Sequence, residues 1–205
     1  KYNLHEIQSY FCLIDLADKI KIKKIKSKKD KITFKGPFAK LVNKSNNSVL
    51  NLLKLLRNLD LISSFYSVTV IKNIPVFAGL GGGTGNAAFI YKYLFKRRIN
   101  RSLLNLIEGK IGSDFKIFFY NQGFLKNLDS IVNLKKKQKL FFVLIQPNVK
   151  CSTKEIYSRV KNYSKKTTFE KRMISSQLEF VRHLSKGSND LQSIVEKKYP
   201  IIKKL

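Results

Sequence analysis

Apolar and polar residues alternate along several stretches of the first third of the chain, a pattern typical of strands with one face toward a core and one toward water. Residues 19–25 and 31–34 alternate in this way, and the polar residues 27–30 between them predict a turn. The apolar residues 10–16 are also assigned to β structure. Residues 67–74 alternate again and stop at a proline, which predicts a further strand.

Apolar residues spaced three and four apart predict helices further along the chain. A first helix is expected after the capping sequence Asn46-Asn47-Ser48, and a second over residues 86–97. Ser102 is expected to cap a third helix that stops near residues 109–112. The apolar residues that share one face of the first helix are Val49, Leu52, Leu53, Leu56 and Leu59.

The last part of the chain mixes apolar stretches with helical patterns. Strands are predicted over residues 114–120 and 140–146, and the final helix is expected to begin at Asn189-Asp190. Strands and helices do not follow a repeated strand–helix–strand order, so the pattern indicates the α+β class.

The composition indicates a folded protein. The chain has 205 residues, of which 43% are hydrophobic, too many for a disordered chain. Its apolar stretches all fall well short of the ~18 residues that a membrane-spanning helix needs. The distant Cys12 and Cys151 suggest neither a disulfide framework nor a metal site, so we expect a reduced, cytoplasmic protein. The polar run 135–139 predicts a boundary between domains over residues 1–137 and 138–205.

The formal charge of +28 invites comparison with nucleic-acid-binding proteins. The 41 basic residues comprise 34 Lys and 7 Arg, however, and Arg is the residue that reads bases and grips phosphate with two hydrogen bonds. This excess of lysine disfavours dedicated nucleic-acid recognition. Two readings stay open: a solvated surface in a protein from a genome rich in A and T, and a surface that binds polyanions.

The most informative segment is Ala-Gly-Leu-Gly-Gly-Gly-Thr-Gly-Asn-Ala-Ala at residues 78–88, between a predicted strand and a predicted helix. Glycines let backbone N–H groups approach a ligand, and a helix N-terminus adds partial positive charge, so the segment predicts a phosphate-binding loop. The alternative is a flexible connection without a ligand.

The segment does not fit several known types of phosphate-binding loop. The segment lacks the Gly-Lys-Ser/Thr of a Walker A loop, and no H-R-D or D-F-G sequence of a protein kinase follows. Residues 83–88 fit the G-x-G-x-x-A dinucleotide fingerprint, which requires an acidic residue at the end of a second strand about 20 residues later. Glu108 lies at that distance but in a helical pattern, so this fingerprint fails.

Together with the preceding Ile74-Pro75, the segment resembles the ATP loop of the GHMP kinases. Its triple glycine resembles most the 4-diphosphocytidyl-2-C-methyl-D-erythritol kinase family, whose pattern is P-x-x-x-G-L-G-G-G-S-S-[DN]-A-A. Other segments are similar to motifs of this family in the same order, across nearly the whole chain. These are residues 5–9, residues 15–20, Asn47, residues 112–114, Pro147 with Thr153 and Tyr157, and Asn189-Asp190.

The resemblance implies a two-domain GHMP kinase fold of the α+β class. Residues 1–137 would form the ribosomal-protein-S5-like ATP-binding domain without its first strand, and residues 138–205 part of a ferredoxin-like domain. The implied reaction is ATP-dependent phosphorylation of the 2-hydroxyl of 4-diphosphocytidyl-2-C-methyl-D-erythritol in non-mevalonate isoprenoid synthesis. The alternatives are another GHMP kinase, similar to mevalonate or homoserine kinase, and a basic nucleic-acid-binding protein. The partner would be a small-molecule substrate and not a membrane, and the protein a monomer or a homodimer.

The resemblance also implies roles for individual residues. Asp114 would be the catalytic carboxylate that accepts the hydroxyl proton. His5 would hydrogen-bond the cytosine edge, Tyr157 would stack on its face, and Thr153 would join them in binding substrate. Mg²⁺ would accompany ATP, and its protein ligands are left unassigned. The ATP loop would consist of Ala78, Gly79, Leu80, Gly81, Gly82, Gly83, Thr84, Gly85 and Asn86.

The chain departs from the family pattern in several places. The P-A-K-[LIV]-N motif with its catalytic lysine and the late G-[ST]-G motif are both missing, so we expect a chain truncated at both ends and inactive as given. Gly85 replaces the usual second serine of the loop, while Thr84 keeps the first hydroxyl. Asn3 and Leu4 replace the Gly and Tyr before His5, which would leave cytosine stacking to Tyr157.

Overall fold

The computed structural model describes residues 7–96, 100–127, 130–134, 137–149, 151–165, 169 and 176–205, without the side chains of residues 153 and 154. These residues group into two compact units. The first, here called the glycine-loop unit, comprises Cys12–Val76 and Leu80–Asn121. The second, the flanking unit, comprises the described residues up to Phe11, Phe77–Gly79, and those from Gln122 onward. The sequence placed its boundary after residue 137, and that domain assignment stays a prediction.

The glycine-loop unit contains a sheet in the order β2-β4-β3, formed by β2 (Lys19–Ile25), β4 (Phe65–Ile71) and β3 (Lys31–Lys35). Strand β2 runs antiparallel to β4 and β3 runs parallel to it. The predicted strands over residues 19–25 and 31–34 are thereby confirmed. Strand β4 starts and ends earlier than predicted. It ends at Ile71 because the N–H groups of Asn73 and Ile74 donate to the side chain of Asp18 instead of a neighbouring strand.

Three helices of this unit are α1 (Ser48–Asn58), α2 (Gly82–Leu94) and α3 (Arg101–Ile111). The predicted cap of α1 is confirmed, because the Asn47 side chain accepts from the Leu50 N–H at 3.0 Å. The cap predicted for α3 is wrong. Asn100, not Ser102, accepts from the Leu103 N–H, and Ser102 lies in the first turn, where an asparagine two residues earlier already fills the capping position. Helix α2 begins inside the glycines, before the predicted residue 86.

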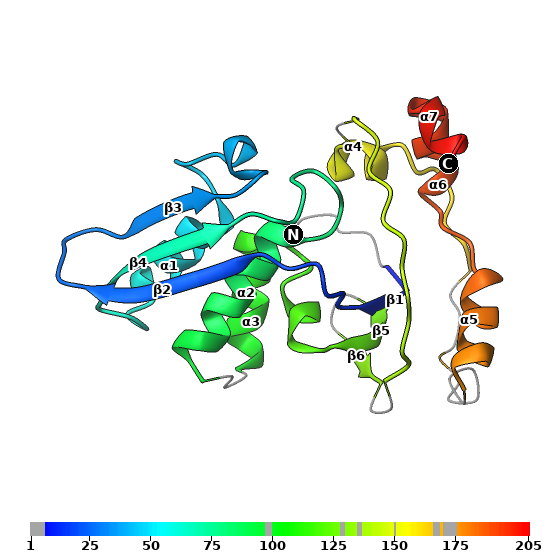
Figure 1. Cartoon of the computed structure of the whole chain (residues 1–205). Coiled ribbons are helices and arrows are strands. Elements are labelled where there is room, and N and C mark those ends of the chain that lie inside the picture. The colour runs from blue at the N-terminus through cyan, green and yellow to red at the C-terminus, as the bar shows by residue number, and fades with distance from the viewer. Residues whose placement is uncertain are drawn as a thin grey trace. The chain divides into compact units, whose positions relative to one another are not determined.

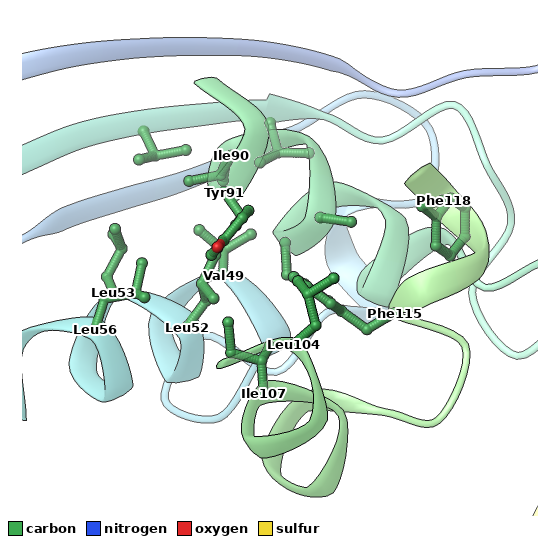
Figure 2. Close-up of a cluster of buried hydrophobic side chains, with 14 residues drawn as sticks. Val49, Leu52, Leu53, Leu56, Ile90, Tyr91, Leu104, Ile107, Phe115 and Phe118 are labelled. Carbon is green, nitrogen blue, oxygen red and sulfur yellow. The ribbon is translucent and has the colours of Figure 1, made fainter. Parts of the chain in front are cut away.

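The helices cover one face of the sheet and enclose the core of this unit (Figures 1 and 2). Alternation along the strands brings Val68 and Val70 of β4 into this core, while Lys side chains of β2 and β3 are exposed. Leu59, predicted on the apolar face of α1, is the C-cap residue and is partly exposed. The buried side chains labelled in Figure 2 are Val49, Leu52, Leu53, Leu56, Ile90, Tyr91, Leu104, Ile107, Phe115 and Phe118.

Two short helical turns complete this unit, η1 (Ala39–Leu41) and η2 (Lys116–Phe119). The latter corrects the strand predicted over residues 114–120. The rings of Phe115 and Phe119 both contact Tyr91, at centroid distances of 6.0 and 5.8 Å, so residues four apart face the same side. Phe115 and Phe118, three apart, are also both buried, as in a helical turn, whereas a strand would direct them to opposite sides.

The flanking unit contains the sheet β1-β5-β6, formed by β1 (Ser9–Cys12), β5 (Gln122–Asn127) and β6 (Ser130–Asn133). Tyr10 lies at the centre of an aromatic cluster, with ring centroids 4.8 Å from Phe124 and 5.3 Å from Phe180. The helices that follow the sheet are α4 (Thr153–Ser158), α5 (Gln177–Ser185), α6 (Gln192–Lys198) and α7 (Pro200–Lys203). Helix α6 is the helix predicted to begin at Asn189-Asp190, and it starts at Gln192.

The strand predicted over residues 140–146 is wrong. In the described stretch 137–149 no residue belongs to a strand or helix, and the side chains of Phe141 to Ile145 are exposed, Val143 to 88%. A strand forms only where a neighbour accepts its backbone hydrogen bonds, and an apolar run does not reveal whether one is present. None of the described helices is long and apolar enough to cross a membrane.

Candidate functional site

The glycine-rich segment contains the start of helix α2. Gly81 is the N-cap residue of α2 and has a left-handed backbone with φ of +63°, which glycine adopts without strain. Its carbonyl accepts from the Gly85 N–H at 2.8 Å. The first turn is Gly-Gly-Thr-Gly, so its N–H groups are flanked by small residues and carry the positive end of the helix dipole. This arrangement suits an anionic group such as phosphate.

The Phe118 ring of η2 packs against this turn. A Cβ atom on Gly81 would lie 2.9 Å from Cζ of Phe118, and one on Gly85 would lie 2.8 Å from Cε1. The backbone carbonyl of Phe118 also accepts a hydrogen bond from the Lys92 ammonium of α2. The ring therefore fills the space next to both glycines, and any side chain at either position requires the ring to move.

Asp114 stands directly before η2 and beside the loop. Its Oδ2 atom lies 3.8 Å from the position of a Cβ atom on Gly81. The Asp114 backbone carbonyl accepts from the Ile117 N–H at 3.2 Å, which fixes the residue at the start of η2. Asp114 retains exposed surface, yet the protein around its carboxyl group raises the pKa through burial. A carboxylate with a raised pKa next to an anion-binding loop can accept a proton from a bound hydroxyl group.

Other polar groups surround the same turn. A Cβ atom on Gly112 would lie 2.8 Å from Oγ1 of Thr84, so the Thr84 hydroxyl faces the segment that carries Asp114. The Ser48 hydroxyl at the start of α1 lies 3.2 Å from the Cβ position of Gly83. Three segments distant in sequence thus meet around the first turn of α2.

Sequence reasoning missed the charged pair that lies under the loop. The Lys72 ammonium lies 3.3 Å from the Cβ position of Gly82 and pairs with the Asp18 carboxylate. Both side chains are almost fully buried, at 4% and 1% exposure. A lysine at the end of an alternating stretch gives no local sign of burial. The available signal was the position of Asp18 within residues 15–20, one of the segments similar to a family motif.

The structure brings together Leu80 to Asn86 and Asp114, all within the glycine-loop unit. Asn86 is buried, and its side-chain amide donates to Asp18 at 2.8 Å. Ala78 and Gly79 group with the flanking unit. The roles of all these residues in ligand binding stay predictions.

The predicted substrate residues are described only in part. Tyr157 is half-buried on α4 of the flanking unit. His5 and the Thr153 side chain lie outside the described residues. Wherever the structure describes side chains, no group of three His, Cys, Asp or Glu could hold a metal ion on its own.

Several known proteins are similar to this chain. No family model matches the sequence. The 4-diphosphocytidyl-2-C-methyl-D-erythritol kinase of Pelagibacter ubique (strain HTCC1062) is 36% identical over 212 residues, which cover 100% of this chain and 73% of that protein.

Two solved structures resemble the fold, each at 18% sequence identity. A 4-(cytidine 5'-diphospho)-2C-methyl-D-erythritol kinase superposes with a TM-score of 0.66, over 98% of this chain and 72% of the other. The homoserine kinase of Cytophaga hutchinsonii ATCC 33406 superposes with a TM-score of 0.54, over 82% and 57%. The predicted GHMP kinase fold of the α+β class is thereby confirmed. Because a relative of this identity matches all of this chain and 73% of its own length, the chain belongs to the 4-diphosphocytidyl-2-C-methyl-D-erythritol kinase family.

Proposed function

We propose that this protein transfers the γ-phosphoryl group of ATP to the 2-hydroxyl of 4-diphosphocytidyl-2-C-methyl-D-erythritol, a step of non-mevalonate isoprenoid synthesis in the cytoplasm. The observation that carries the proposal is the 36% identity to the Pelagibacter ubique kinase along the whole chain. The position of Asp114 beside the glycine-rich turn gives it a chemical basis.

The segment from Ala78 to Asn86 holds the ATP phosphates. Backbone N–H groups at the start of α2 donate to phosphate oxygens, and the Thr84 hydroxyl offers a side-chain contact in the same turn. Mg²⁺ neutralises phosphate charge when bound. Phosphate oxygens and water would supply most of its ligands.

Asp114 acts as the general base. The substrate hydroxyl oxygen forms a bond to the γ-phosphorus, the bond from that phosphorus to the bridging oxygen of ADP breaks, and Asp114 takes the hydroxyl proton. The chain contributes mainly position and charge, because phosphoryl transfer depends little on covalent chemistry by the protein. A carboxylate with a raised pKa holds such a proton better than an ordinary aspartate.

The cytidine end of the substrate is assigned to His5, Thr153 and Tyr157. His5 hydrogen-bonds the cytosine edge, Thr153 contributes a hydroxyl, and the Tyr157 ring stacks on the base. Replacing Tyr157 with Ala then raises KM for the cytidine substrate and leaves KM for ATP unchanged. An unchanged KM for both would contradict the stacking role.

The direct test is ADP release by the protein encoded by the full reading frame that contains these 205 residues. We expect release that depends on 4-diphosphocytidyl-2-C-methyl-D-erythritol and falls at least about 1,000-fold in Asp114→Asn, since removing a base and its charge combines two effects. Asp60→Asn is the matched control, because Asp60 is exposed at the end of α1 and Asn tolerates its positive φ of 55°. ADP release stimulated by mevalonate or homoserine instead would show that the protein is a kinase but acts on a different substrate.

A further inference from the structure

The carboxylate of Asp18 collects donors from both sides of the glycine-rich segment. Its Oδ1 accepts from the backbone N–H groups of Asn73 at 2.7 Å and Ile74 at 2.8 Å. Its Oδ2 accepts from the Lys72 ammonium and from the Asn86 side-chain amide, the latter at 2.8 Å. Both oxygens of one carboxylate are thus used, and each binds a different pair of groups.

These donors lie before the glycine-rich segment and in its last part. Residues 72–74 directly precede Pro75, and Asn86 lies in α2 just after Gly85. The residues between them include several glycines, which leave the backbone many conformations to choose from. A fixed point that joins both ends restricts those conformations, because closing a segment at its ends removes much of its freedom.

The pair with Lys72 also sets the charge next to the loop. Lys72 lies against Gly82, at the positive end of α2, where its charge alone would oppose the helix dipole. The Asp18 carboxylate compensates the charge of Lys72 and holds the Lys72 ammonium next to the turn. A buried ion pair contributes little net stability compared with apolar side chains of the same size. We therefore assign this pair a role in positioning the loop and not in raising the stability of the fold.

We propose that Asp18 is a positioning residue for ATP binding: it joins Asn73 and Ile74 to Asn86 and thereby holds the N–H groups at the start of α2 in place for phosphate. The inference rests on the proposed ATP-dependent function. Asp18 acts through the loop and does not itself contact a ligand, since its side chain is 1% exposed.

The chain offers a matched control for a buried carboxylate. Asp30 is similarly buried, with a side chain 4% exposed, and accepts from Arg57 at 3.0 and 3.2 Å and from the Tyr66 N–H at 2.8 Å. None of these partners belongs to the glycine-rich segment. Asp30→Asn therefore reports the cost of disturbing a buried ion pair in the same unit without touching the loop.

The experiment measures the Kd of ATP by titration calorimetry and the stability by urea unfolding, for wild type, Asp18→Asn, Asn86→Ala and Asp30→Asn. An Asn at position 18 presents an amide nitrogen to the donors of Lys72 and Asn86. Loss of hydrogen bonds to a charged group then raises the Kd of ATP by about tenfold or more. Asp30→Asn is expected to lose comparable stability while its Kd stays within about twofold of wild type.

Asn86→Ala keeps the ion pair and cuts only the link to α2, so it remains informative if Asp18→Asn fails to fold. We expect it to raise the Kd of ATP by about threefold or more. The double variant Asp18→Asn/Asn86→Ala should bind no more weakly than Asp18→Asn, because both changes break the same link. In turnover, KM for ATP should rise while KM for the cytidine substrate stays unchanged.

ATP binding by Asp18→Asn and Asn86→Ala as tight as that of wild type, or weakened equally in Asp30→Asn, would overturn the positioning role alone. Independent, multiplying losses in the double variant would also overturn it. A wild-type protein that binds no ATP would overturn the proposed function together with this inference, so the two failures are distinguishable.

Discussion

The carboxylate of Asp114 lies beside Gly81, with Oδ2 3.8 Å from the position of a Cβ atom on the glycine. Phe118, four residues after Asp114, fills the space next to Gly81. Asp114, Phe118 and the start of α2 all lie in the glycine-loop unit. Changes at this contact are expected to affect ligand binding and proton transfer together.

Gly81→Ala is expected to weaken ATP binding. Alanine at a φ of +63° costs about 1 kcal/mol or more, and its Cβ atom would lie 2.9 Å from Phe118. Removing this close contact requires the turn or the Phe118 ring to shift. A shift of the turn displaces the N–H groups that face the phosphates. The measurement is the Kd of ATP by titration calorimetry, with an expected rise of about tenfold, equivalent to ~1.4 kcal/mol.

The same substitution elsewhere in this unit provides the control. Gly109 lies inside α3, and no atom within 4 Å would meet a Cβ atom there. Gly109→Ala should stabilise the protein by about 0.5–1 kcal/mol, through the higher helix propensity of alanine, and leave ATP binding unchanged. Equal ATP affinity in both alanine variants would show that the geometry at Gly81 is irrelevant to the ligand.

Asp114→Asn is expected to gain stability while it loses activity. Burial raises the folded-state pKa of Asp114 above its ordinary value of 3.8, so ionising the group costs stability in the folded protein. Stability from this group is greatest below pH 3.8 and is lost as pH rises through the folded-state pKa. The variant escapes this loss, so urea unfolding should show it to be more stable at pH 7, by a margin that shrinks toward pH 4.

The same pKa sets the acid limb of activity. A base must be ionised to accept a proton, so kcat/KM of the wild type should fall at acid pH with an apparent pKa above 3.8. Asp60→Asn is the control for both measurements and should leave the pH dependence unchanged. A stability difference between wild type and Asp114→Asn that is constant from pH 4 to 8 would contradict the burial argument.

Local signals in the sequence were enough to predict several elements of the fold. Strand β2 has its predicted bounds, because alternation over seven residues determines which face is buried. The cap of α1 was predicted because Asn47 directly precedes a run of leucines in helical spacing. In both cases the predictive signal lies in residues near in sequence, although β2 also requires pairing with the distant β4.

Other features depend on contacts between distant residues, which local patterns do not contain. Helix α2 includes three glycines in its first turn, a composition that disfavours a helix until Phe118 and Ser48 pack against it. The link between Asp18 and Asn86 joins residues 68 positions apart. For the site, the sequence therefore predicted the loop and Asp114 but not the buried pair that supports the loop.

Asn47→Ala is expected to destabilise the glycine-loop unit by about 1 kcal/mol, because the Leu50 N–H loses the side-chain acceptor at 3.0 Å. Asn47→Ser retains a capping oxygen and should recover most of the loss. Urea unfolding of both variants checks this. An alanine variant as stable as the serine variant would show that water satisfies the helix end equally well.

Gln122→Met is expected to destabilise the flanking unit. The buried Gln122 side chain donates to the Gln138 carbonyl at 3.1 Å and accepts from the Gln138 N–H at 2.8 Å. Methionine has a similar length but offers neither bond, so the free energy of unfolding should fall by about 1–3 kcal/mol. Hydrogen exchange should also accelerate at the Gln138 amide. Gln192→Met on the exposed face of α6 is the control and should stay within about 0.5 kcal/mol of wild type. If both variants unfold alike, the segment around Gln138 is held by its other contacts, and the Gln122 pair contributes no stability.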